Sequence, residues 1–205
     1  MNQKIFFITI SMQTQDNLKC LPYRKEDTGE LFTRPCSFPG IAMLESCILG
    51  DEDIKIVTVR TNDDNNRTNE NYNLFKRELQ ALSADLGREL AINEEIIIPH
   101  SENKDKQFQL YKEICSHYED GADIYMDITY GTKVTSACLF STLTYAEKIS
   151  KCDIKGVYYG KIPYGNETFG ELYNVSCLYE LSMLANTADF MTKERFDSLV
   201  KDLWG

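Results

Sequence analysis

The chain has 205 residues, of which 42% are hydrophobic and 11% aromatic, and its formal net charge is −10. This composition is typical of a globular protein and excludes an intrinsically disordered one. The acidic balance argues against binding to duplex nucleic acid, and no apolar run approaches the roughly 20 residues that a membrane-spanning helix needs. The apolar run at residues 5–10 is too short for a signal-peptide core. We therefore expect one soluble domain in the cytoplasm.

Strand-like and helix-like segments alternate along the chain, which is the pattern of a parallel sheet covered on both faces. It predicts an α/β, Rossmann-like fold with a mostly parallel six-stranded sheet and helices on both faces. Strands are expected at residues 4–10, 54–60, 95–99, 123–129, 154–159 and 172–175, the last a candidate for an antiparallel edge strand. Helices are expected at residues 39–49, 71–90, 105–118, 132–150, 177–189 and 193–204.

Two polar stretches do not fit regular elements. Residues 13–37 contain Pro22, Gly29 and Pro35 and are expected to be an excursion between the first strand and the first helix. Residues 62–71 are rich in Asn and Asp and are expected to be exposed. The sequence shows neither a repeat nor an interdomain linker. We assign residues 1–176 to one domain and expect residues 177–205 to pack on it as a helical segment.

The strongest candidate site is the run Asp127-Ile128-Thr129-Tyr130-Gly131-Thr132-Lys133, which ends an apolar strand and opens a helix. In open α/β sheets ligands bind beyond the carboxyl ends of the strands, where helix N-termini attract anions. Gly131 would let the backbone approach a ligand, Thr132 could cap the helix or donate a hydroxyl, and Lys133 adds a positive charge. Ser136 follows in the first helical turn. The alternative is a capped turn with a lysine facing solvent.

Two further candidates lie at the ends of other predicted strands. Ser11 and Gln13 follow the first strand and would reach the same rim if that strand is central. Residues 158–161, Tyr-Tyr-Gly-Lys, end the fifth strand, and their alternative interpretation is aromatic packing beside an exposed lysine. His100 follows the third strand and could also reach the rim.

Other familiar chemistries lack their residues. The seven cysteines are widely spaced without a C-x-x-C pair, so we expect reduced, mostly buried thiols and no metal site. Neither a dinucleotide fingerprint nor a P-loop occurs in the sequence, and two histidines give little basis for a catalytic triad. We expect no cofactor.

The run from Asp127 to Lys133 resembles the ligand-binding motif of the CRISPR-associated Rossmann fold (CARF) domains. Residues 152–160, a strand entering a Tyr-Gly turn, and the helix at residues 178–186 are similar to segments of the same family. The resemblance covers residues 124–186, and the order of elements agrees with the family over the rest of the chain.

The resemblance implies a two-fold homodimer that binds cyclic oligoadenylate, a second messenger of type III CRISPR antiviral defence, across the dimer cleft. Cyclic tetra-adenylate has a symmetry that suits such a site. Carried over to this chain, Thr129, Gly131, Thr132 and Lys133 would cradle the phosphates, and Ser11 and Gln13 would approach from the first strand. The full set of candidate ligand-binding residues is Ser11, Gln13, Thr129, Tyr130, Gly131, Thr132, Lys133 and Ser136.

Three functions remain open from the sequence. The first is a sensor that binds the ring. The second is a metal-independent ring nuclease, in which a ribose 2′-OH attacks the adjacent phosphodiester and leaves a 2′,3′-cyclic phosphate. Lys133 would be its catalytic residue and would stabilise the charge that develops on the phosphate. The third is a protein-interaction subunit with an empty pocket. Many family members continue into an effector domain, so we expect either a stand-alone protein or part of a longer effector.

Overall fold

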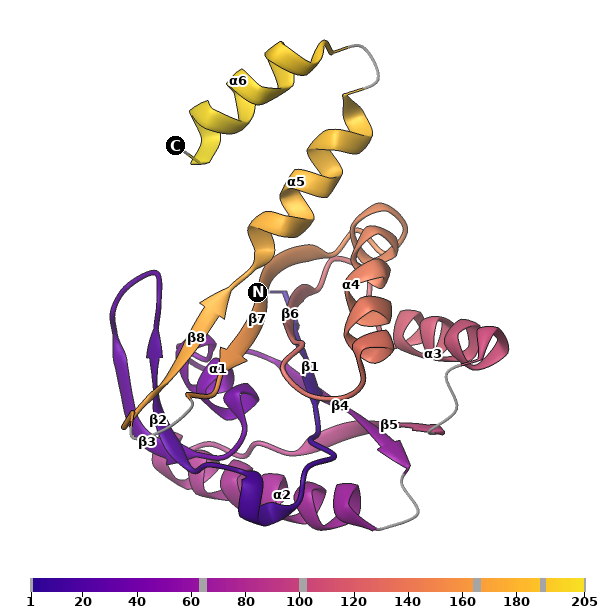
Figure 1. The fold of residues 1–205 in the computed structure, drawn as a ribbon. Helices are drawn as coiled ribbons and strands as arrows, with labels where there is room; N and C mark the ends of the chain where they lie inside the picture. Colours follow the sequence, from indigo (N-terminus) through magenta and orange to yellow (C-terminus); the bar gives the residue numbers. More distant parts are fainter. Residues whose placement is uncertain (1, 63–65, 100–102, 164–166, 189–190, 205) are drawn as a thin grey trace.

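An eight-stranded mixed sheet forms the centre of the protein (Figure 1). The computed structural model describes residues 2–62, 66–99, 103–163, 167–188 and 191–204. The strands are β1 (Lys4–Thr9), β2 (Leu21–Lys25), β3 (Leu31–Cys36), β4 (Ile54–Asn62), β5 (Ile92–Pro99), β6 (Asp123–Asp127), β7 (Asp153–Lys161) and β8 (Gly170–Asn174). Their order across the sheet is β3-β2-β8-β7-β6-β1-β4-β5.

Most neighbouring strands are parallel. The run β7-β6-β1-β4-β5 is parallel throughout, with β1 between β6 and β4. Strand β8 is antiparallel to β7, β2 is parallel to β8, and β3 is antiparallel to β2. The predicted α/β class and mostly parallel sheet are therefore confirmed.

The predicted count of six strands was wrong. The polar stretch at residues 13–37 contains β2 and β3, which form a hairpin and extend the sheet beyond β8. Only Tyr23 of β2 is buried, so the hairpin lacks the apolar run that marks a central strand in a sequence. Because β2 pairs with β8, β8 is an inner strand and not the edge strand that the sequence suggested.

Helices cover both faces of the sheet, as predicted. They are α1 (Pro39–Cys47), α2 (Arg67–Leu86), α3 (Lys104–Ser116), α4 (Lys133–Lys148), α5 (Ser176–Thr187) and α6 (Lys193–Trp204), with a short 3-10 helix η1 (Gln15–Asn17). Residues 62–71 were expected to be exposed, but α2 begins at Arg67, and Thr68 and Asn71 are buried.

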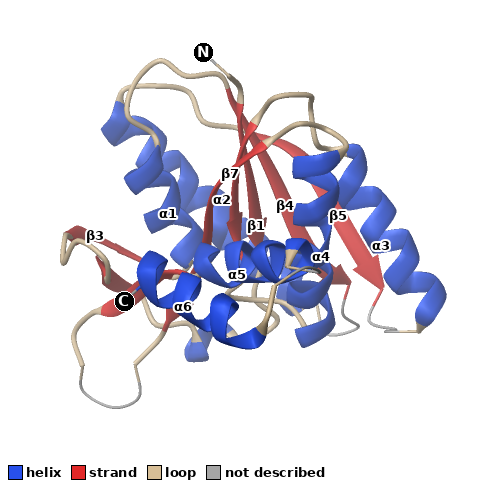
Figure 2. Cartoon of the chain, turned by 90° about the horizontal axis from the view of Figure 1, so that it is seen from above, coloured by secondary structure: helices blue, strands red, loops and turns tan. Residues whose placement is uncertain are grey.

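Two layers of side chains join the sheet to these helices, because successive residues of a strand point to opposite faces. Phe6 and Ile8 of β1 pack in the core beneath α1 and α2, on what we call the α1 face. Ile5 and Phe7 pack in the core beneath α3, α4 and α5, on the α4 face. Figure 2 shows the sheet between these two groups of helices.

The C-terminal helices differ in how they meet the rest of the fold. Helix α5 packs on the α4 face through the buried Tyr179, whose hydroxyl donates to Glu147 Oε2 of α4 at 2.7 Å. Helix α6 lies beyond α5 and away from the sheet (Figure 1). In the described ranges, every helix is too short or too polar to cross a lipid bilayer.

The cysteines are unpaired and most of them are buried. Cys36, Cys47, Cys115 and Cys152 are buried, Cys138 and Cys177 are half-buried, and Cys20 is exposed. The prediction that most of the thiols are buried is confirmed.

Candidate functional site

Helix α4 begins at the edge where the five parallel strands end. Strand β6 stops at Asp127, and the chain reaches α4 within a few residues through Gly131 and Thr132. Gly131 has φ +87°, a backbone conformation that favours glycine. A Cβ atom there would also lie 3.2 Å from Cβ of Thr135, so the turn depends on glycine for two reasons.

Among the described residues, the first turn of α4 contains two backbone amides without a hydrogen-bond acceptor. Thr132 is the N-cap, and its hydroxyl accepts from the amide of Thr135 at 3.2 Å. Within the described part of the chain, the amides of Lys133 and Val134 have no hydrogen-bond partner. The Lys133 side chain is exposed beside them. Because these donors lie at the positive end of the helix dipole, the turn can hold an anion.

A buried carboxylate holds this turn to the sheet. Asp127 is completely buried, and its Oδ1 accepts from the Thr129 amide at 3.0 Å and from the Thr129 hydroxyl. Its Oδ2 accepts from the hydroxyl of Thr9, on β1, at 3.2 Å. The amide of Tyr130 donates to Thr9 Oγ1 at 2.9 Å, and the amide of Gly160, on β7, donates to Thr129 Oγ1 at 2.8 Å. Three neighbouring strands therefore meet at Asp127.

The hydrogen bonds around Asp127 engage the only proton of the Thr129 hydroxyl. That hydroxyl donates to Asp127 and accepts from Gly160, so it has no second proton to offer a ligand. We therefore interpret Thr129 as a residue that holds the turn in place, while the amides behind it remain open.

Three other predicted site residues also turn inward. Ser11 is fully buried, and its hydroxyl accepts from the amide of Gln13 at 3.1 Å. Tyr130 is buried in the core on the α1 face, where its hydroxyl donates to the Ser37 carbonyl at 2.9 Å. Ser136 is half-buried and donates to the Ile128 carbonyl at 3.2 Å. Each of these side chains makes a hydrogen bond inside the protein and so stabilises the edge of the sheet where the strands end.

Gln13 remains at the surface of the same edge. Its side chain is exposed, and Asn71 fixes its backbone by donating to the carbonyls of both Ser11 and Gln13 at 2.8 Å. The structure thus leaves Gly131, Lys133 and Gln13 as the exposed members of the predicted set, with Thr132 half-buried.

Burial shifts the pKa values of the ionisable side chains beneath the turn. The loss of hydration raises the pKa of Asp127 to about 6, although the hydrogen bonds from Thr129 and Thr9 oppose the shift. The start of α1 lies close by, since a Cβ at Gly40 would be 3.4 Å from Asp127 Oδ2. Burial also raises the pKa of Tyr130. The hydrogen bonds from Thr129 and Thr9 are thus the interactions that stabilise the buried carboxylate of Asp127.

The cavity that borders the turn is small. It has a volume of about 20 Å³ between α3, α4 and the end of β5, and Thr132, Val134 and Thr135 contribute to its lining. That volume holds about one water molecule. An open groove of about 480 Å³ runs between α3 and α4 from Val134. A nucleotide-sized anion would therefore lie on the open surface of the edge.

The other candidates fall in different places. Tyr158 is buried near Cys47 in the α1-face core, whereas Tyr159 and Lys161 are exposed at the end of β7. His100 lies outside the described residues. His117 caps the far end of α3, where burial lowers its pKa. Across the described ranges, the acidic, histidine and cysteine side chains form no cluster of three or more suited to a metal ion.

Sequence reasoning gave no individual role to Thr9, Asn71 or Gly160, although Gly160 lies in the candidate run at residues 158–161. Each acts through a contact between residues far apart in the chain, as when Asn71 reaches Ser11, 60 positions away. Asp127 did carry a local signal, because an Asp two residues before a Thr at a strand end favours the side chain-to-backbone bond seen here.

Comparison of the sequence with protein-family models and with curated proteins found no match.

Proposed function

We propose that this chain is a Rossmann-like CARF domain that binds cyclic oligoadenylate, most favourably cyclic tetra-adenylate, as a sensor in type III CRISPR defence in the cytoplasm. One observation carries the proposal. The amides of Lys133 and Val134, which have no partner among the described residues, and the exposed Lys133 side chain lie together where five parallel strands end. The sequence of this same turn resembles the CARF motif.

The net charge of the chain supports a binding site in which a few nearby donors hold the phosphates. A protein with net charge −10 repels a polyanion at long range, so attraction must come from nearby donors. The helix N-terminus supplies backbone amides, and Lys133 supplies a full charge at the same turn.

The openness of the edge supports a homodimer. A cavity of about 20 Å³ cannot enclose a cyclic oligonucleotide, and one turn contacts only part of a ring. Two turns related by a two-fold axis would surround a symmetric ring, and a two-fold dimer is the commonest way to present them.

Binding without turnover is favoured over ring cleavage. Asp127 is the only carboxylate of the motif, and it is completely buried and bonded to hydroxyls, so it cannot reach a ribose 2′-OH as a base. A ring nuclease at this site would rely on positioning and on the charge of Lys133 alone.

The test is incubation of the protein with labelled cyclic tetra-adenylate in EDTA, followed by separation of bound and free ring and of products. A bound, unchanged ring supports the sensor. Linear di-adenylate with a 2′,3′-cyclic phosphate shows the ring nuclease instead. Absence of binding to rings of every size refutes both and leaves a protein-interaction subunit.

A further inference from the structure

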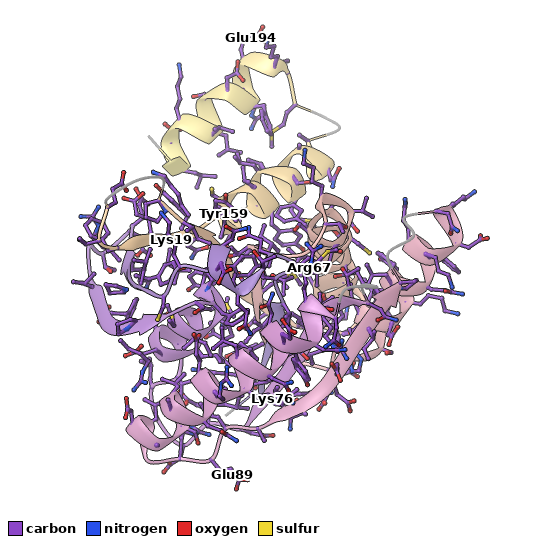
Figure 3. The ribbon with its side chains drawn as sticks, turned by 60° about the horizontal axis from the view of Figure 1, so that its bottom comes forward. Lys19, Arg67, Lys76, Glu89, Tyr159 and Glu194 are labelled. Carbon is purple, nitrogen blue, oxygen red and sulfur yellow. The ribbon has the colours of Figure 1, made fainter. Side chains whose placement is uncertain are left out.

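The end of β7 presents an aromatic ring to solvent. Tyr158 points to the α1 face and is 4% exposed, whereas Tyr159 points to the α4 face and is 44% exposed. Val157, the previous residue on the α4 face, is fully buried. The cover provided by α4 and α5 therefore ends between Val157 and Tyr159, and Figure 3 shows Tyr159 near α5.

Tyr159 lies beside the turn that leads into α4. Asp127 pairs with Tyr158 in the parallel register of β6 and β7, so Tyr159 is next to Ile128, one strand spacing of about 4.8 Å away. The next residue, Gly160, donates its amide to Thr129 Oγ1 at 2.8 Å. The ring is thus fixed, through its own backbone, to the turn that carries the open amides.

The surroundings of Tyr159 favour a nucleotide. Tyr173 lies directly opposite it on β8 and is half-buried. Lys161 and Arg24 flank this face and both donate to the carboxylate of Glu171, at 3.1 and 3.0 Å, as does the hydroxyl of Tyr173. Across the described residues, the hydroxyl and ring of Tyr159 have no hydrogen-bond or ring partner.

We propose that Tyr159 stacks on an adenine base of the ligand whose phosphates bind at the turn. This inference rests on the proposed function and adds what that site lacks. Backbone amides and Lys133 recognise phosphate, and phosphate carries no information about the base. An aromatic face beside a phosphate cradle is how proteins hold unpaired bases.

The experiment compares two ligands and four proteins by equilibrium binding. The ligands are cyclic tetra-adenylate and the same ribose-phosphate ring without bases. The proteins are the wild type, Tyr159→Ser, Tyr159→Phe and the control Leu49→Ser, which changes an exposed side chain at the end of α1. Tyr159→Ser should weaken binding of the adenylate ring by about 5- to 150-fold, and Tyr159→Phe should bind it like the wild type.

Binding of the base-free ring should be the same in all four proteins, because that ring has no base for Tyr159 to stack on. Equal affinity of wild type and Tyr159→Ser for cyclic tetra-adenylate would overturn the stacking role and leave the proposed function standing. An equal loss for both rings would also overturn it, since the effect would not involve the base. If the wild type binds neither ring, the proposed function fails and the stacking role fails with it.

Discussion

Lys133 supplies the full positive charge in the first turn of α4, and its loss should weaken binding of the ring. We expect Lys133→Ala to cost about 1.5–3 kcal/mol of binding free energy per site, which is the usual scale of a charge-assisted hydrogen bond. The fold should be unaffected, because the side chain is exposed. Isothermal titration calorimetry with cyclic tetra-adenylate measures the effect.

Lys148, in the last turn of the same helix, is the matched control. Lys148→Ala removes the same charge at the far end of α4 and should leave affinity unchanged. Should wild type and Lys133→Ala bind the ring equally well, the turn would be an ordinary capped strand-to-helix connection. If the ring is cleaved, Lys133→Ala should reduce the rate beyond its effect on binding, because phosphodiester charge grows toward the transition state.

Asp127 should make the stability of the fold depend on pH. Its pKa rises from 3.8 to about 6 on folding, so the folded state holds a proton that the unfolded state has already lost between these values. The contribution is fully present below pH 3.8 and is lost as the pH rises through 6, on the order of 3 kcal/mol. Asp127→Asn lacks this contribution.

Urea unfolding at pH 4 and pH 7 tests the assignment. The stability of the wild type relative to Asp127→Asn should fall as the pH rises from 4 to 7. A difference between the two proteins that is the same at both pH values would show that Asp127 titrates normally.

At the scale of the element, the turn into α4 depends on the backbone of Gly131. Gly131→Ala places a side chain at φ +87° and 3.2 Å from Cβ of Thr135, and we expect a loss of about 1–2 kcal/mol of stability. Gly50→Ala is the matched control, because nothing lies within 4 Å of the added Cβ. Thermal unfolding of both variants gives the comparison, and equal melting temperatures would refute a strained turn.

The sequence predicts the elements whose apolar pattern is strong. All five strands of the parallel run were expected, because a buried parallel strand such as β1 is a continuous apolar run. The β2-β3 hairpin was missed because it is stabilised by pairing with β8 rather than by its own pattern. The start of α2 was missed because Asn and Thr favour loops, whereas Asn71 is buried in the fold, where it donates to the carbonyls of Ser11 and Gln13 just after β1.

The position of the candidate site could be predicted, but not the orientation of its side chains. A strand followed by Gly, Thr and Lys indicates a helix N-terminus at the sheet edge whatever the rest of the fold. Whether the hydroxyl of Thr129 faces outward depends on Asp127, Thr9 and Gly160, which come from three strands. The sequence around Thr129 does not show that these three residues come together in the fold.

At the scale of the whole molecule, we expect a homodimer that brings two copies of residues 129–133 toward one cleft. Light scattering at micromolar concentration, with and without cyclic tetra-adenylate, should give twice the mass of the chain. A monomer under both conditions would contradict the shared cleft and would leave each turn to bind its ligand alone.

The thiols report on the integrity of the fold. In native protein Cys20 should react quickly with Ellman's reagent, Cys138 and Cys177 more slowly, and the four buried thiols only on unfolding. Cys20→Ser should remove the fast phase. Rapid reaction of most thiols in the native state would show that the packing around them is wrong.

The central position of β1 has a consequence for how the chain reaches its fold. Strand β1 precedes the other described strands in the sequence, yet it pairs with β4 and with β6, and its register with β6 joins Lys4 to Asp123. The middle of the sheet cannot form until β6 has been synthesised and has left the ribosome. Because such distant pairings must overcome loop-closure entropy, we expect slow folding and an apolar β1 that needs protection during synthesis.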